Sequence, residues 1–66
     1  MRIEIRVRAT QVEDGWAVEV YDRAGLLVKT GCFHKSNVCS TAISAASIAL
    51  GENEGRIKID RTEYAS

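Results

Sequence analysis

The sequence contains no proline, one histidine, two cysteines and only four aromatic residues among its 66 positions. Without proline, no strand or helix is interrupted by a residue that lacks a backbone amide hydrogen. Two cysteines, Cys32 and Cys39, are too few for the disulfide framework of a small secreted domain. No apolar run approaches the ~20 residues that span a bilayer, and residues 1–8 lack the apolar stretch of a signal peptide. We therefore expect a cytoplasmic protein that does not contact a membrane.

The sequence also lacks an excess of charge, because nine basic and nine acidic residues cancel. A neutral chain has no overall field to attract nucleic acid or a membrane surface, although local clusters of one sign remain effective. Hydrophobic residues make up 45% of the chain and charged residues 27%, which is typical of a globular domain. A chain of this length forms one domain with a small core, and such domains often need a disulfide, a metal or a partner chain.

Three segments in the first half show the pattern of strands joined by short turns. Residues 2–8 alternate charged and β-branched side chains, so one face is apolar and the other is charged. Residues 16–21 and 26–30 also read as strands, and turn residues at 13–15 and 22–25 separate the three segments. Because short turns join antiparallel neighbours, the first half is predicted to be a three-stranded meander.

The pattern changes to that of a helix at residues 36–37, where Ser and Asn side chains can cap a first helical turn. Apolar residues then recur every three or four positions up to Gly51, whose place suits a left-handed residue at a helix end. Residues 56–60 alternate again and are predicted to form a fourth strand, whereas residues 62–66 are predicted to fray. The helix residues predicted to face the sheet are Cys39, Ala42, Ile43, Ala46, Ala49 and Leu50.

The chain is therefore predicted to be an α+β domain of order β-β-β-α-β, with one helix packed on one face of a mainly antiparallel four-stranded sheet. The domain spans residues 1–61, and the frayed tail follows it. A helix that crosses back over the sheet makes the fourth strand parallel to an earlier one, and we expect that neighbour to be the first strand. Trp16 shares the apolar face of its strand with Val18 and Val20 and is predicted to lie in the core.

Two segments resemble known small domains. Residues 21–28, Tyr-Asp-Arg-Ala-Gly-Leu-Leu-Val, are followed by Gly-Cys-Phe-His-Lys-Ser at 31–36 and then by the predicted helix. This succession is similar to YegP-like domains, small bacterial units of uncharacterised function, and it resembles the N-terminal part of HicB-like antitoxins. The resemblance extends over residues 1–60 and implies the same order of strands and helix. A fold does not by itself determine a function.

The only cluster of metal-ligand residue types is Cys32, His34 and Cys39. Zinc requires a fourth ligand, and the Cys-x-x-Cys spacing of structural zinc sites is absent. Free cysteines more often serve as small buried apolar residues. Cys39 lies in the first helical turn, where a reactive thiol can arise, but no carboxylate is spaced to orient the single histidine for catalysis. We therefore expect no enzymatic activity, no metal and no cofactor.

The charged face of the predicted sheet carries more basic than acidic residues. Alternation places six basic residues and one tyrosine there, against Glu4, Glu19 and Asp60. An open basic sheet with an aromatic residue resembles the surface that sheet-based RNA-binding domains use. The alternative is a solvated face on which opposite charges pair across strands. The candidate nucleic-acid face consists of Arg2, Arg6, Arg8, Tyr21, Lys29, Arg56 and Lys58.

The outer face of the predicted helix lacks charge entirely, from Ser36 to Leu50. Helices on a protein surface normally carry charge on the side away from the core, and charge depletion marks the centre of protein interfaces. The alternative is a polar helix in a protein whose solubility comes from the sheet. The candidate protein interface consists of Ser40, Thr41, Ser44, Ala45, Ser47 and Ile48.

Two hypotheses of function follow from these surfaces. The first is a small non-enzymatic interaction or regulatory module, of the size of a phage or plasmid regulator, that forms a homodimer and binds an unidentified protein. The second is a module that binds nucleic acid through the basic open face of the sheet. Binding to generic RNA or DNA that weakens steeply with salt distinguishes the second from the first.

Overall fold

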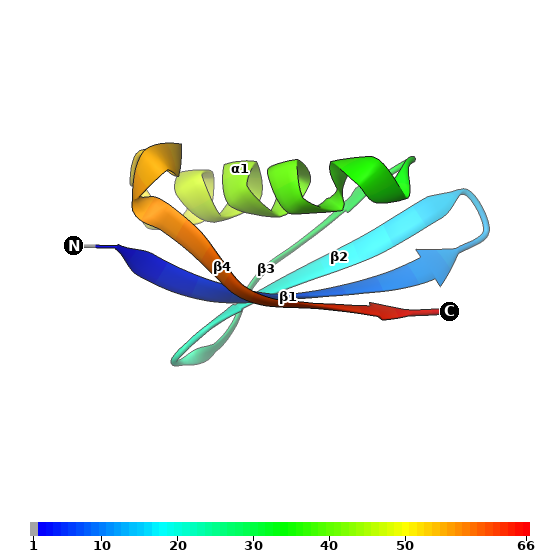
Figure 1. Cartoon of the computed structure of the whole chain (residues 1–66), viewed down its shortest axis with the longest axis horizontal. Helices are drawn as coiled ribbons and strands as arrows, with labels where there is room; N and C mark the ends of the chain where they lie inside the picture. The colour runs from blue at the N-terminus through cyan, green and yellow to red at the C-terminus, as the bar shows by residue number, and fades with distance from the viewer. Residues whose placement is uncertain (1) are drawn as a thin grey trace.

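A computed structural model describes residues 2–66 and arranges them in the order β-β-β-α-β (Figure 1). The predicted α+β fold is confirmed, with one helix against one face of a mainly antiparallel sheet. Short 3-10 turns, η1 and η2, flank the helix on either side. The elements are β1 (Ile3–Val12), β2 (Gly15–Asp22), β3 (Gly25–Cys32), η1 (Lys35–Asn37), α1 (Val38–Leu50), η2 (Glu54–Arg56) and β4 (Ile57–Ala65).

The four strands form one sheet in the order β3-β2-β1-β4. β2 pairs antiparallel with both β1 and β3, whereas β4 pairs parallel with β1. In the turn between β2 and β3, the Asp22 carboxylate accepts a hydrogen bond of 2.8 Å from the Ala24 amide, which holds the turn closed. The predicted meander and the predicted place of the fourth strand beside the first are both confirmed.

The core lies between α1 and the face of the curved sheet that the helix covers, and the opposite face is open (Figure 1). Three of the nine buried residues are alanines. Side chains this small on α1 allow the helix backbone to lie close to the strands. The buried residues are Ile5, Val7, Ala9, Val18, Val20, Val38, Ala42, Ala46 and Ile57.

The helix is rotated relative to the orientation predicted from its apolar pattern. Its buried residues are Val38, Ala42 and Ala46, whereas Cys39 and Ala49, both predicted to face the sheet, are exposed. This part of the prediction was wrong because α1 is apolar or small on every side. Its periodicity therefore does not single out one face, and packing against the strands decides the rotation.

The C-terminal end of α1 follows the prediction and the N-terminal end does not. Gly51 adopts a left-handed φ of 66°, and its amide donates to the Ile48 carbonyl, as expected of a glycine that ends a helix. At the other end, Asn37 occupies the cap position without a side-chain capping bond. Its backbone amide instead donates to the His34 carbonyl at 3.0 Å, so a 3-10 turn starts the helix.

β4 is longer than the sequence pattern predicted. It begins at Ile57, one residue later than expected, and it continues to Ala65, so the tail predicted to fray pairs with β1. A bulge explains the difference, because the pairing skips Asp60 between Ile59 and Arg61. The extra residue breaks the two-residue alternation, and the second half of the strand therefore did not show in the sequence pattern.

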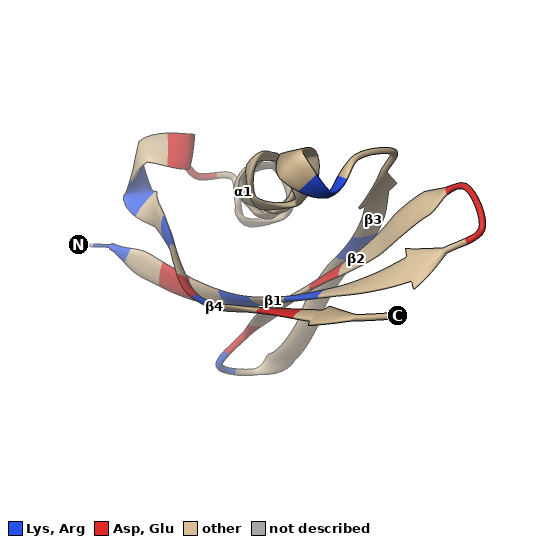
Figure 2. Cartoon of the chain, turned by 45° about the vertical axis from the view of Figure 1, so that its right-hand side comes forward, with Lys and Arg blue, Asp and Glu red and all other residues tan. Residues whose placement is uncertain are grey.

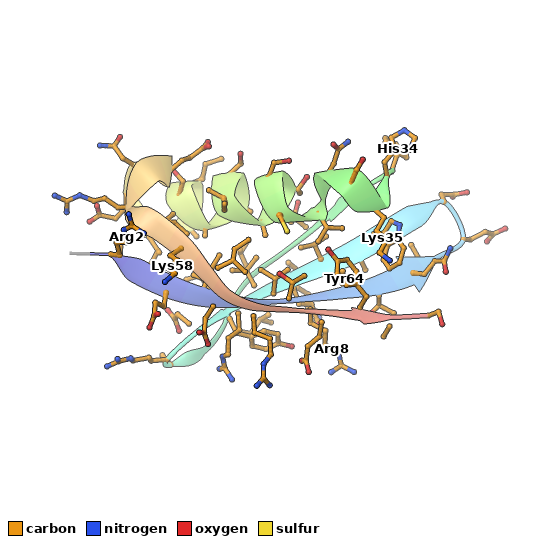
Figure 3. The ribbon with its side chains drawn as sticks, viewed as in Figure 1. Arg2, Arg8, His34, Lys35, Lys58 and Tyr64 are labelled. Atoms are coloured by element: carbon orange, nitrogen blue, oxygen red, sulfur yellow. The ribbon has the colours of Figure 1, made fainter. Side chains whose placement is uncertain are left out.

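Trp16 was predicted to lie in the core and lies at its rim. Its side chain is half-buried and packs against the buried residues. The Tyr64 ring meets it edge-on, with ring centroids 5.9 Å apart. The Lys35 ammonium lies 4.7 Å from the centroid of Tyr64, above the end of β4 (Figure 3). Trp16, Tyr64 and Lys35 together cover the end of the core next to the first turn of the helix.

Candidate nucleic-acid interface

All four strands of the sheet carry charged residues (Figure 2). On β1, Arg6 and Arg8 are exposed and alternate with the buried Ile5 and Val7, because successive side chains of a strand point to opposite faces. Arg8 points away from the helix in Figure 3. The register of β2 places Tyr21 beside Arg6. The predicted neighbourhood of these three residues is therefore present in the structure.

The bulge in β4 adds an arginine that sequence analysis missed. After the bulge, Arg61 lies beside Arg6 on the neighbouring strand. Simple alternation from Ile57 and Ile59 would place residue 61 on the covered face. The sequence did contain a signal for the bulge, because alternation puts a charged residue at a position that should be apolar. Charged residues are rarely buried, and a bulge before residue 61 moves it to the open face.

Three arginines and one aromatic ring meet in a hollow of 310 Å³ on the open face. This volume lies at the lower end of the range of about 300–1,000 Å³ in which small-molecule sites fall. The Arg6 guanidinium lies 5.9 Å from the centroid of the Tyr21 ring, within the distance of a cation–π contact. The lining residues are Arg6, Val7, Arg8, Tyr21, Arg61 and Glu63.

In the described chain, residues 2–66, the three arginines of this hollow form no ion pair. Among residues 2–66, the open face contains a single ion pair, which joins Lys29 to Glu19 at 3.9 Å. Glu19 also accepts a hydrogen bond of 3.2 Å from the Tyr21 hydroxyl. Glu19 on β2 and Glu63 on β4 both lie beside Arg8 in the register, but neither forms an ion pair with it within the described chain. Opposite charges therefore lie beside Lys29 and Arg8, whereas Arg6 and Arg61 lie beside each other with no acidic residue opposite them in the register.

The phenol of Tyr21 is held in its neutral form. Burial raises its pKa above the usual 10, and the hydrogen bond and charge of Glu19 raise it further, whereas Arg8 and Arg6 lower it. At neutral pH the ring is therefore an uncharged surface bordered by cations. Such a surface can stack with a planar group while its neighbours bind an anion.

A second hollow, of 540 Å³, lies beside the start of β1 and the turn between β2 and β3. Its charged residues are three arginines and three carboxylates, so their charges balance. It is larger than the first hollow but has no net attraction for an anion. The charged residues that line it are Arg2, Glu4, Arg6, Asp22, Arg23 and Asp60.

The remaining basic residues of the predicted face lie outside the Tyr21 hollow. Lys29 is occupied by its ion pair, and Lys58 lies beside Glu4 in the register of β1 and β4. Arg56 does not belong to the open face, because it lies in η2 and forms an ion pair of 3.8 Å with Glu52, just after the helix. This residue was assigned to the fourth strand because alternation was extended one position too far.

The predicted protein interface on α1 is less available than its composition suggested. Ser40 and Ile48 are exposed, and the other four residues of this set are half-buried. Its three serines each donate a local hydrogen bond, so the absence of charge partly reflects hydroxyls used within the chain. These bonds run from Ser40 to the Asn37 carbonyl at 3.1 Å, from Ser44 to the Glu54 carboxylate at 3.2 Å, and from Ser47 to the Glu52 carbonyl.

Cys32, His34 and Cys39 do not converge on a common point. The Cys32 thiol donates to the His34 carbonyl at 3.3 Å, and the Cys39 thiol lies 4.0 Å from the Thr62 hydroxyl on β4. Within residues 2–66 no three His, Cys, Asp or Glu side chains gather closely enough to hold a metal ion. The expectations of no enzymatic activity and no cofactor stay predictions.

Comparisons with known proteins return no match: no model of a protein family, no curated protein and no solved structure is similar to this chain. The resemblance to YegP-like domains and HicB-like antitoxins therefore stays a prediction. Among residues 2–66, no helix combines the length and the apolarity that crossing a bilayer requires.

Proposed function

We propose that the protein binds single-stranded nucleic acid through the open face of its sheet. The observation that supports this most is the Tyr21 hollow, where three arginines that form no ion pair, and one carboxylate, border a neutral aromatic ring. A base can stack on the Tyr21 ring while the guanidinium groups bind the phosphates on either side of it. The cellular role we attach to this activity is that of a small cytoplasmic regulator of phage or plasmid type.

Single-stranded ligands fit this surface better than duplexes. Stacking on Tyr21 requires a base whose face is free, and the faces of bases in a duplex are covered by their neighbours. Reading a duplex requires a helix or a ribbon that enters the major groove. The open face instead presents four strands side by side with α1 on their far side.

The magnitudes predict weak, salt-sensitive binding with little sequence preference. Three phosphate contacts to a single strand correspond to a slope of about −2 in a plot of log affinity against log salt. One stacked base contributes about 1–3 kcal/mol. Both contributions are insensitive to base identity, because every nucleotide has a phosphate and every base has a flat face.

The test measures fluorescence anisotropy of a labelled oligouridine of about 12 nucleotides between about 50 and 200 mM salt. The wild-type protein is expected to bind with the slope given above. Arg6→Glu combined with Arg61→Glu is expected to abolish binding, because two of the three cations become anions. Tyr21→Ala is expected to weaken binding about 5- to 150-fold, which is the loss of one stacked base, and to leave the salt slope unchanged.

Arg56→Ala is the matched control, because it removes a positive charge that lies in η2 and outside the open face. Binding within twofold of wild type is expected for this variant. No binding by the wild-type protein at the lowest salt would contradict the proposal. Equal losses from Arg56→Ala and from Arg6→Ala would also contradict it, since binding would then follow total charge and not the hollow.

A further inference from the structure

The two edges of the sheet differ in how well they are protected from a further strand. β4 forms one edge and carries four charged residues among its nine, together with the bulge at Asp60. β3 forms the other edge and carries a single charged residue among its eight, Lys29, which already pairs with Glu19. Charges and bulges are devices that keep edge strands from pairing with other chains. Because β3 also has a register shift, at Leu27, the two edges differ in charge, and β3 is the less protected edge for that reason.

Apolar side chains border the β3 edge. Leu26 is 50% exposed, and Leu27 and Val28 remain only partly buried although they pack against the core. The register of β3 shifts near Leu27, so residues 28–32 are its regular part. In this part, alternate backbone amides and carbonyls point away from β2 and have no strand beside them.

One flank of α1 lies above the same edge. The opposite flank is identified by Cys39, whose thiol lies 4.0 Å from Thr62 of β4. Residues of a helix advance by about 100° each, so Ile48, nine positions after Cys39, projects about 180° away from it and toward the β3 side. Thr41 and Ala45 fall on the same flank as Ile48 by this spacing. Ile48 is 83% exposed, the most exposed large apolar residue of the described chain.

We propose that this edge binds a second copy of the chain. β3 pairs antiparallel with β3 of the partner about a two-fold axis, which extends the sheet to eight strands, and the Thr41, Ala45 and Ile48 flanks of the two helices meet above the junction. A two-fold contact joins identical patches, so a patch whose only charge is already paired creates no repulsion between copies. The same contact at β4 would bring two sets of four charges together. The proposal is independent of nucleic-acid binding, because it leaves the Tyr21 hollow free.

Sedimentation equilibrium over a range of protein concentrations tests the association, and amide hydrogen exchange tests which edge is used. The wild-type protein is expected to have twice the mass of the chain at high concentration. Exchange is expected to slow on association for alternate amides of residues 28–32 and to stay unchanged for residues 57–65. Ile48→Glu is expected to raise the dimer dissociation constant about tenfold or more, because it places two like charges across the axis.

Val12→Glu is the matched control, because Val12 is also exposed but lies at the far end of β1, away from β3 and the helix flank. Its dissociation constant is expected to equal that of wild type. A monomer at every concentration would overturn the proposal, and so would slower exchange on association in β4 instead of β3. Equal effects of Ile48→Glu and Val12→Glu would overturn the role of the helix flank. The exchange measurement on wild-type protein decides the edge even if a variant fails to fold.

Discussion

The two faces of β1 show how neighbouring residues serve different purposes in this protein. On the covered face, Ile5 and Val7 are 1% and 2% exposed. On the open face, Arg6 and Arg8 project into solvent beside Tyr21. The covered face is built from apolar side chains that stabilise the fold, whereas the open face holds charges with too few partners to contribute much stability. The comparison indicates that stability and ligand binding are separable residue by residue along one strand.

The largest expected effect comes from a pair of adjacent substitutions on β1. Ile5→Ala removes a fully buried side chain and is expected to lower the free energy of unfolding by about 2–5 kcal/mol, a large part of the roughly 3–10 kcal/mol that a domain of this size has. Arg6→Ala is expected to change it by no more than about 0.5 kcal/mol and to weaken oligonucleotide binding. Urea denaturation of both variants measures the difference. Similar destabilisation by the two would mean that the faces are not separable.

A smaller effect is expected from the two aromatic residues of β2, which lie on opposite faces. Trp16 is half-buried against the core and Tyr64, so Trp16→Ala is expected to destabilise the protein by about 1.5–3 kcal/mol, less than the 3–5 kcal/mol of a fully buried ring. Tyr21→Ala is expected to leave stability nearly unchanged. Thermal unfolding followed by circular dichroism measures both. A greater loss of stability from Tyr21→Ala would show that the open face has a structural role.

The smallest expected effect is on the alkaline titration of the two tyrosines. Burial raises the pKa of Tyr64, and Cys39 and then Cys32 raise it further, whereas burial and then Glu19 raise the pKa of Tyr21. When folding raises a tyrosine pKa, the folded state binds the proton more tightly than the unfolded state does. The resulting contribution to stability is complete below pH 10 and is lost as the pH rises through the pKa of the folded state. Absorbance at the tyrosinate band is expected to show both groups ionising above 10.

Two substitutions assign these titrations to the two faces. Cys39→Ser is expected to bring the pKa of Tyr64 closer to 10 without changing that of Tyr21, because it removes the Cys39 thiol that raises the pKa of Tyr64. Glu19→Gln is expected to do the same for Tyr21 alone. A single variant that moved both titrations would show that the two tyrosines are coupled through the sheet.

Much of the architecture could be predicted from local patterns. The alternation in residues 2–8 identified both faces of β1, and the turn residues at 22–25 identified the connection between β2 and β3. These patterns are informative because side-chain direction in a strand depends only on the position along the chain. For the same reason, Arg6, Arg8 and Tyr21 could be assigned to one face before the strands were placed beside one another.

Other features depended on contacts between distant segments. Arg61 belongs to the candidate site because the bulge at Asp60 in the pairing of β4 with β1 turns it to the open face. Arg56 does not belong to the site because it lies in η2, before the strand begins. The rotation of α1 about its axis could not be predicted from the sequence either, because a helix with small or apolar residues on every side fits a sheet in more than one orientation. In each case the local pattern was compatible with two arrangements, and the packing energy of the whole domain selected one.

The sequence by itself determined the element order, the separation of apolar from charged faces, and the glycine that ends the helix. Each of these depends on the conformational preferences of a few consecutive residues. Only the tertiary structure decided which arginines surround Tyr21, which flank of α1 lies above β3, and which edge of the sheet is unprotected. These depend on the register between strands about 55 residues apart in the sequence, such as β1 and β4. That register is set by the burial of the shared core and not by any local preference.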